Sequence, residues 1–271
     1  MSDGEQIRSL LAENGQRADD GIDILESALL LGASAMPDTD LDPYRAHLRT
    51  LIAETSAAGE TGKPQALRSV LHQRHRYAGD VETYDDLRNA DLIHVIDRRK
   101  GLPVALGILY IGVCRALGWQ ASGLAFPGHF LVSIDERGQR LIVDPFAGGE
   151  TRDAEDLRSL LKSVAGADAE LKPHHYAPVS DREVLVRLQN NIKTRAIDRS
   201  DFPLAVRAVE SILLIAPDNL PAVRELGLLE ARAGNLLRAV ETLEDFLART
   251  PADAERQRTT ILLDRLRRMI N

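Results

Sequence analysis

Three short segments rich in β-branched and apolar residues lie between residues 119 and 146, and they constrain the fold of this chain more than any other feature. They are Trp119–Phe126, Gly128–Asp135 and Arg140–Phe146, separated by turn residues at 127–128 and 136–139. The pattern predicts a meander of three antiparallel strands. If Arg137 and Gly138 form a two-residue hairpin loop, Leu131 lies opposite Asp144.

This register brings a histidine and an aspartate to one face of the sheet. His129 is two residues from Leu131, so it is a diagonal neighbour of Asp144. A carboxylate that orients an imidazole forms part of the nucleophile–base–acid triad of hydrolytic enzymes. The sequence therefore indicates His129 and Asp144 as candidate catalytic residues. The alternative interpretation is a hydrogen-bonded pair that braces the sheet.

The segment before the strands predicts a helix that begins at Pro103, a residue well suited to a first helical turn. Its apolar residues follow helical spacing: Leu106, Leu109, Tyr110, Val113, Cys114 and Leu117. Cys114 is the only cysteine and lies about 16 Å along the axis from Pro103. Because this thiol is too far away to reach His129 at the helix start, we expect a buried structural cysteine.

Composition and charge limit the class of protein. The net charge of −7 and the 44% hydrophobic content are typical of a soluble globular protein, and they give no basis for nucleic-acid binding. Without a signal-peptide pattern, a long apolar run or a second cysteine, we expect a cytoplasmic protein that does not insert into membranes. Two histidine pairs, His72 with His75 and His174 with His175, lack a third ligand nearby, so no metal or other cofactor is expected.

Helical patterns fill the first eighty residues, with one helix ending before Pro37 and others beginning near Pro43 and Pro64. Further along, the basic run 98–100 is expected to be a solvated helix end.

An internal repeat occupies the last third of the chain. Pro217 and Pro251 are 34 residues apart, and the apolar residues between them have the offsets of a tetratricopeptide unit. We expect a degenerate first repeat from about Asp181 to Pro217 and a capping helix over 253–270; a generic helical bundle is the alternative. The first helices of the two repeats would form a concave face that binds a protein or peptide partner, unless the face is occupied internally. Its candidate residues are Arg187, Asn190, Thr194, Arg224 and Leu228.

Four motifs resemble those of the SirB-type bacterial proteins, which join a transglutaminase-like, papain-type core to tetratricopeptide repeats. The motifs are Asn89-Ala90-Asp91-Leu92, the run from Arg98 to Pro103, Pro127-Gly128-His129-Phe130-Leu131, and the run from Asp144 to Gly149. The resemblance implies an α+β fold: helices packed on a small antiparallel sheet in a degenerate transglutaminase-like core, then an all-α region. It implies domains at 1–178, with the core at about 81–150, and at 179–271.

The resemblance also implies a missing nucleophile. In the transglutaminase-like superfamily a Gly-x-Cys begins the helix, where the helix dipole lowers the thiol pKa. In this chain Pro103 or Ala105 occupies the cysteine position. We therefore expect a noncatalytic binding or scaffold protein. The alternative is an amide hydrolase or acyl transferase that uses His129 and Asp144, with Tyr84 and Asn89 as candidate hydrogen-bond donors to the reacting oxygen. Nothing in the sequence sets an oligomeric state.

Overall fold

The computed structural model describes residues 3–251 and 254–270. The chain divides at Leu188 and Gln189 into two compact units, called unit 1 and unit 2 below. The boundary lies inside one long helix, α8 (Asp181–Asp198), so this helix contributes residues to both units. In the described part of the chain no helix is long and apolar enough to cross a membrane.

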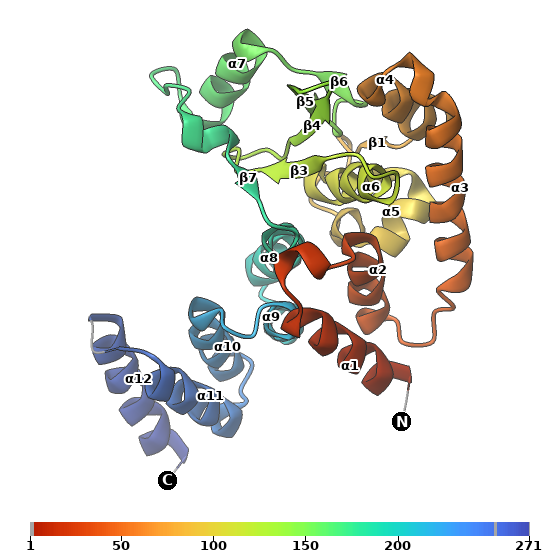
Figure 1. Ribbon diagram of the computed structural model, residues 1–271. Helices are drawn as coiled ribbons and strands as arrows, with labels where there is room; N and C mark the ends of the chain where they lie inside the picture. Colours follow the sequence, from red (N-terminus) through yellow and green to blue (C-terminus); the bar gives the residue numbers. More distant parts are fainter. Residues whose placement is uncertain (1–2, 252–253, 271) are drawn as a thin grey trace. The chain divides into compact units, whose positions relative to one another are not determined.

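Helices form the first part of unit 1 (Figure 1). They are α1 (Asp3–Gln16), α2 (Ile24–Ala35), α3 (Asp42–Ala58), α4 (Lys63–Leu67), which continues as a π-helical segment over Arg68–Arg74, and α5 (Leu92–Arg98). Asp23 and Asp91 cap the starts of α2 and α5 by accepting backbone N–H groups. Pro43 and Pro64 lie in the first turns of α3 and α4, where a proline removes no helical hydrogen bond.

Helix α6 (Pro103–Ala116) is the centre of unit 1, and each of its residues from Pro103 to Cys114 is buried. It packs against α2, α3 and α5 and against strands β3 and β4. Gly107 lets the sheet approach closely, because a Cβ atom at this position would lie 2.3 Å from the Phe130 ring. The buried helix predicted from Pro103 is therefore confirmed.

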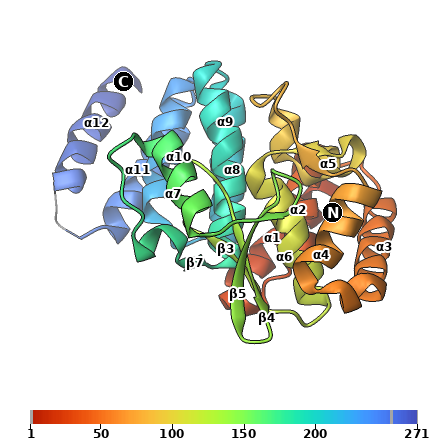
Figure 2. The same cartoon turned by 90° about the horizontal axis from the view of Figure 1, so that it is seen from above.

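The sheet of unit 1 has five strands in the order β6-β5-β4-β3-β7, and neighbouring strands are antiparallel. The strands are β3 (Ala121–Leu124), β4 (Val132–Glu136), β5 (Gln139–Asp144), β6 (Glu150–Thr151) and β7 (Pro178–Val179). Figure 2 shows β4 and β5 side by side up to their hairpin. The hairpin pairs Glu136 with Gln139, so Arg137 and Gly138 form the predicted two-residue loop. A separate parallel pair joins β1 (Ala78–Gly79) to β2 (Lys100–Gly101).

The second face of the sheet packs against α7 (Ala154–Ala165). Leu157 and Leu161 of this helix form an apolar cluster with Leu124, Phe126 and Leu131. Asp153 and Asp156 form a capping box at the helix start. The sheet therefore lies between α6 and α7.

Unit 2 contains antiparallel helices that follow one another along the chain: the end of α8, then α9 (Phe202–Ile215), α10 (Leu220–Arg232), α11 (Leu236–Arg249) and α12 (Ala254–Ile270). Each of α9 to α12 packs against its neighbour in sequence. Gly227 permits the close approach of α10 and α11, because a Cβ atom there would lie 2.6 Å from Leu243. The capping helix predicted over 253–270 is α12; Asp253 lies outside the described residues. The mixed fold, helices and an antiparallel sheet followed by an all-helical region, is confirmed.

Candidate functional site

His129 and Asp144 form a direct hydrogen bond in the structure. The Nε2 atom of His129 lies 2.9 Å from Oδ1 of Asp144. The aspartate is buried, whereas 14% of the histidine side chain is exposed. We call these two residues the dyad.

Asp144 is held as a carboxylate by several donors. Its Oδ1 atom accepts the backbone N–H groups of Phe146 and Ala147, at 3.1 and 3.2 Å, and its Oδ2 atom accepts Nη2 of Arg152 at 3.1 Å. Burial raises the pKa of Asp144, but the hydrogen bond from His129, the backbone donors and the Arg152 charge outweigh burial and lower the pKa overall. An ionised Asp144 can only accept a hydrogen bond, so Nε2 carries the proton and the neutral His129 ring has its unprotonated nitrogen at Nδ1.

Arg187 positions the turn that carries His129. Its guanidinium donates to the carbonyl oxygens of His129 at 2.5 Å and Phe126 at 3.3 Å, and it lies 5.4 Å from the centroid of the Phe130 ring. We predicted Arg187 on a concave partner-binding face. The structure gives it different contacts, because the first half of α8 belongs to unit 1 and packs beside this turn.

An aromatic group lies next to the dyad. The Phe146 ring meets the His129 ring edge-on at 6.0 Å between centroids, and Tyr84 meets Phe146 at 5.9 Å. Tyr84 is 41% exposed, and Val81 in the same loop is 77% exposed. The dyad is therefore flanked by an apolar surface that solvent reaches.

A buried polar network holds the loop that carries Tyr84. Asp80 is 1% exposed; it accepts the N–H and hydroxyl of Thr83 and pairs with Arg98 at 2.9 Å. The amide of Asn89 donates to Thr83 O at 2.7 Å and accepts from Arg98 at 2.8 Å. Asn89 is fully buried, so in this structure its amide orders the loop. The expectation of a solvated run at 98–100 was wrong for Arg98, because it is the counterion of a buried carboxylate.

Two backbone hydrogen bonds connect the segment just before α6 to Phe146, the residue whose ring contacts His129. Gly79 donates to the carbonyl of Phe146 at 3.1 Å, and Asp80 donates to that of Gly101, two residues before Pro103, at 3.3 Å. The side chains at Pro103 and Ala105 are buried and carry no nucleophile.

Cys114 is buried further along the same helix. Burial raises the pKa of its thiol to about 12, so the thiol is neutral at physiological pH.

The residues expected on the repeat face differ in their surroundings. Thr194 is exposed, and Asn190 and Leu228 are half-buried. Arg224 donates to the hydroxyl of Thr259 at 2.9 Å and lies 3.8 Å from Glu255, so α12 engages it within unit 2.

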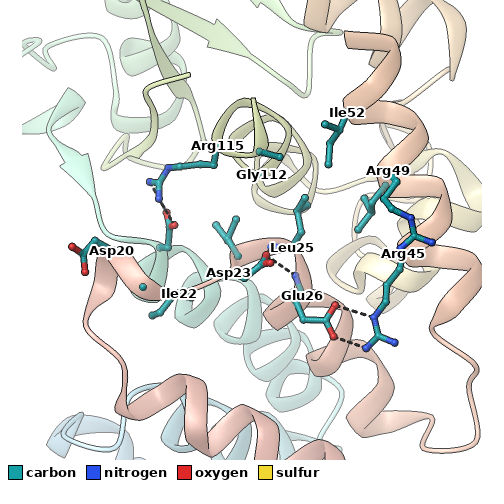
Figure 3. Close-up of a pocket in the computed structure, with 15 residues that line it drawn as sticks. Asp20, Ile22, Asp23, Leu25, Glu26, Arg45, Arg49, Ile52, Gly112 and Arg115 are labelled. Carbon is teal, nitrogen blue, oxygen red and sulfur yellow. Dashed lines mark hydrogen bonds and ion pairs between the residues drawn. The ribbon is translucent and has the colours of Figure 1, made fainter. Parts of the chain in front are cut away.

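Figure 3 shows a different cavity of unit 1, of about 520 Å³, between α2, α3 and α6. Two of its arginines face carboxylates: Arg45 binds Glu26 through two nitrogens, and Arg115 binds Asp181 at 2.7 and 3.0 Å. Arg49, on the same wall as Arg45, has no hydrogen bond or ion pair within the described residues. No histidine, cysteine or hydroxyl side chain lines this cavity, and two of its carboxylates, Glu26 and Asp181, are held by arginines. Across residues 3–251 and 254–270, no three histidine, cysteine or acidic side chains are placed to hold a metal ion.

Sequence reasoning missed the contact of Arg187 with the His129 turn, and it missed Arg152 and the Asp80–Arg98 pair. Arg187 is 58 residues from the carbonyl of His129 that it binds, and an isolated arginine in an amphipathic helix has no pattern that names its partner. One signal did exist for Arg98, since it belongs to a motif that we quoted for the family resemblance.

Comparison with known proteins matches residues 39–190 to the transglutaminase-like superfamily and residues 192–264 to the tetratricopeptide repeat. A UPF0162 protein of Xylella fastidiosa is 31% identical over 247 residues, 86% of each chain. A UPF0162 protein of Vibrio cholerae is 30% identical over 240 residues, 86% of this chain and 88% of that one. Protein SirB1 of Salmonella typhimurium is 26% identical over 160 residues, 59% of each chain. No solved structure matches. The chain therefore belongs to the UPF0162 family of transglutaminase-like proteins with tetratricopeptide repeats, to which SirB1 is similar.

Proposed function

We propose that this protein binds an extended segment of a partner protein beside the dyad and does not transform it chemically. One observation carries the proposal: His129 and Asp144 are ordered and paired, but the single thiol of the chain, Cys114, is buried with a raised pKa. A triad without its nucleophile retains only a small part of its rate acceleration. The same groups remain suitable for recognising a peptide amide.

The surface around the dyad supports binding. Val81 and Tyr84 are exposed side chains of one loop, and Tyr84 is linked to the partly exposed His129 through the ring of Phe146. Exposed tyrosines beside apolar groups are frequent anchors of protein interfaces. Because the buried Asp80–Arg98 pair orders this loop, less conformational entropy is lost when a partner binds.

The repeats of unit 2 support a protein partner in general, since helical-repeat arrays present extended binding surfaces. We infer a second contact surface at Asn190, Thr194 and Leu228. Arg224 borders this surface, and its side chain is held by a hydrogen bond to Thr259 of α12.

A peptide-display selection on the full-length protein tests the proposal. Selected peptides are then measured by fluorescence polarisation on the wild type, His129→Ala and Tyr84→Ala. Leu237→Ala is the matched control, because Leu237 is also an exposed apolar side chain, at 67%. We expect the first two variants to weaken binding and the control to leave it unchanged. If every selected peptide binds all four proteins equally, the dyad surface is not the binding site.

The competing function is hydrolysis or acyl transfer with His129 as base. Its support is the Nδ1 atom of His129, which has no hydrogen-bond partner among the described residues and could accept a proton from water. A mechanism of this kind predicts product formation over time, which binding alone does not.

A further inference from the structure

One edge of the sheet is only partly covered. Strand β6 pairs with Val143 and Asp144 of β5, and the N–H of Arg152 donates to the carbonyl of Ile142 at 2.8 Å. Alternate residues of an antiparallel strand direct their backbone groups to the same side, so Arg140 faces outward like Ile142. Within the described residues, the N–H and C=O of Arg140 and the N–H of Ile142 have no backbone partner. These three groups form an open edge that another strand can extend.

A cavity of about 640 Å³ lies beside this edge. Its apolar part is formed by Leu157, Leu171 and Tyr176, which belong to or pack against the cluster between the sheet and α7. Ile142 lines the same cavity. An apolar side chain of an added strand would therefore find a matching surface next to the backbone groups of β5.

The lining of this cavity contains three arginines and two aspartates, so its formal charge is +1. Its two acids, Asp153 and Asp156, accept backbone N–H groups in the capping box of α7, and those hydrogen bonds lower the pKa of Asp153. Arg152 is bound to Asp144, and Arg140 donates to the carbonyl of Tyr176. Arg158 is exposed, and its charge contributes to the lowered pKa of Asp153, but it has no hydrogen bond or ion pair in the described residues. It is the group available to an incoming carboxylate.

We propose that an extended, acidic segment of a partner protein binds here as an added strand on β5. Its backbone pairs with Arg140 and Ile142, one apolar side chain enters the cavity, and a carboxylate on the same strand face pairs with Arg158. Main-chain pairing supplies affinity in this mode of recognition, and alternate side chains supply specificity. This site does not include the surface at Val81 and Tyr84. The proposal therefore does not depend on the function proposed above.

The test uses the full-length protein and three labelled hexapeptides with blocked ends. In the first, valine and glutamate alternate along one strand face with threonine at the positions between them (Val-Thr-Glu-Thr-Val-Thr). The second has lysine in place of glutamate, and the third is the acidic peptide with every amide N-methylated, so that it cannot donate hydrogen bonds to β5. Fluorescence polarisation at low salt measures their affinities. We expect saturable binding of the first peptide only. Equal binding of the acidic and basic peptides, or of the N-methylated peptide, overturns the proposal.

Two charge reversals locate the site. Arg158→Glu is expected to weaken the acidic peptide by about tenfold or more, as for the loss of a charge-assisted hydrogen bond. Arg49→Glu is the matched control, because Arg49 is also an exposed arginine of unit 1 without a described partner and lines the other cavity. If both variants weaken binding equally, the peptide responds only to the net charge of the protein, and the proposed site is wrong. Amide hydrogen exchange provides the second measurement: the acidic peptide should slow exchange at Arg140 and Ile142, and unchanged exchange at these amides in the saturated complex contradicts strand addition.

Discussion

Replacing Arg187 with methionine tests whether this residue positions the dyad. Methionine retains most of the aliphatic volume and removes the guanidinium. The carbonyl oxygens of Phe126 and His129 then lose their donor in a mostly buried environment. We expect Arg187→Met to destabilise unit 1 and to disturb the His129 ring.

The magnitude follows from the contacts. The bond to His129 O, at 2.5 Å, is charge-assisted, and the bond to Phe126 O, at 3.3 Å, is long and weak. One strong bond of about 1.5–3 kcal/mol and a cation–π contact with Phe130 of about 1 kcal/mol give an expected loss of about 2.5–4 kcal/mol.

Urea unfolding followed by tryptophan fluorescence measures this loss in the correct unit, because Trp119 is the only tryptophan and lies in unit 1. Arg182→Met is the matched control. Arg182 lies on the same helix and also donates to backbone carbonyls, those of Gly15 and Arg17. Both variants should lower the free energy of unfolding, but only Arg187→Met should shift the NMR signals of the His129 ring. Unchanged His129 signals in Arg187→Met, or equal shifts in both variants, would refute the positioning role.

Three further predictions concern unit 1. Cys114 should resist iodoacetamide in the native protein and react fully after unfolding, since its thiol is buried and neutral; rapid native labelling would contradict this. Burial and the Arg99 charge lower the pKa of His47 from 6.5 to about 4, so between these values the unfolded chain binds a proton that the folded protein does not. Stability should therefore fall by about 2–3 kcal/mol as the pH falls through this window, and His47→Gln should flatten the profile; an unchanged slope would exclude His47 as the cause. Gly107→Ala should cost about 1–3 kcal/mol by overpacking against Phe130, and wild-type stability would show that the sheet can shift away.

The hairpin register was predictable because a two-residue loop leaves little freedom. Arg137 and Gly138 both have positive φ, at 55° and 80°, as a tight hairpin turn requires. Pairing then continues regularly to Val132 opposite Val143, one position from Leu131 and Asp144. The contact between His129 and Asp144 depends on that register.

Other features had no local signal. Strands β6 and β7 have two residues each, too few to show an alternating pattern. The sequence predicts a solvated Arg98, and no local pattern indicates that Asp80 is buried or that it is the partner of Arg98. Long-range polar contacts of this kind form when packing brings distant elements together.

The most direct test of the central claim asks whether the protein changes a peptide that it binds. Full-length protein is incubated with the selected peptides and methylamine, and mass spectrometry follows the peptide masses over time beside protein-free and His129→Ala samples. We predict bound peptides whose masses stay as in the protein-free sample. Hydrolysis or amine incorporation that increases with time and disappears in His129→Ala would contradict the noncatalytic account.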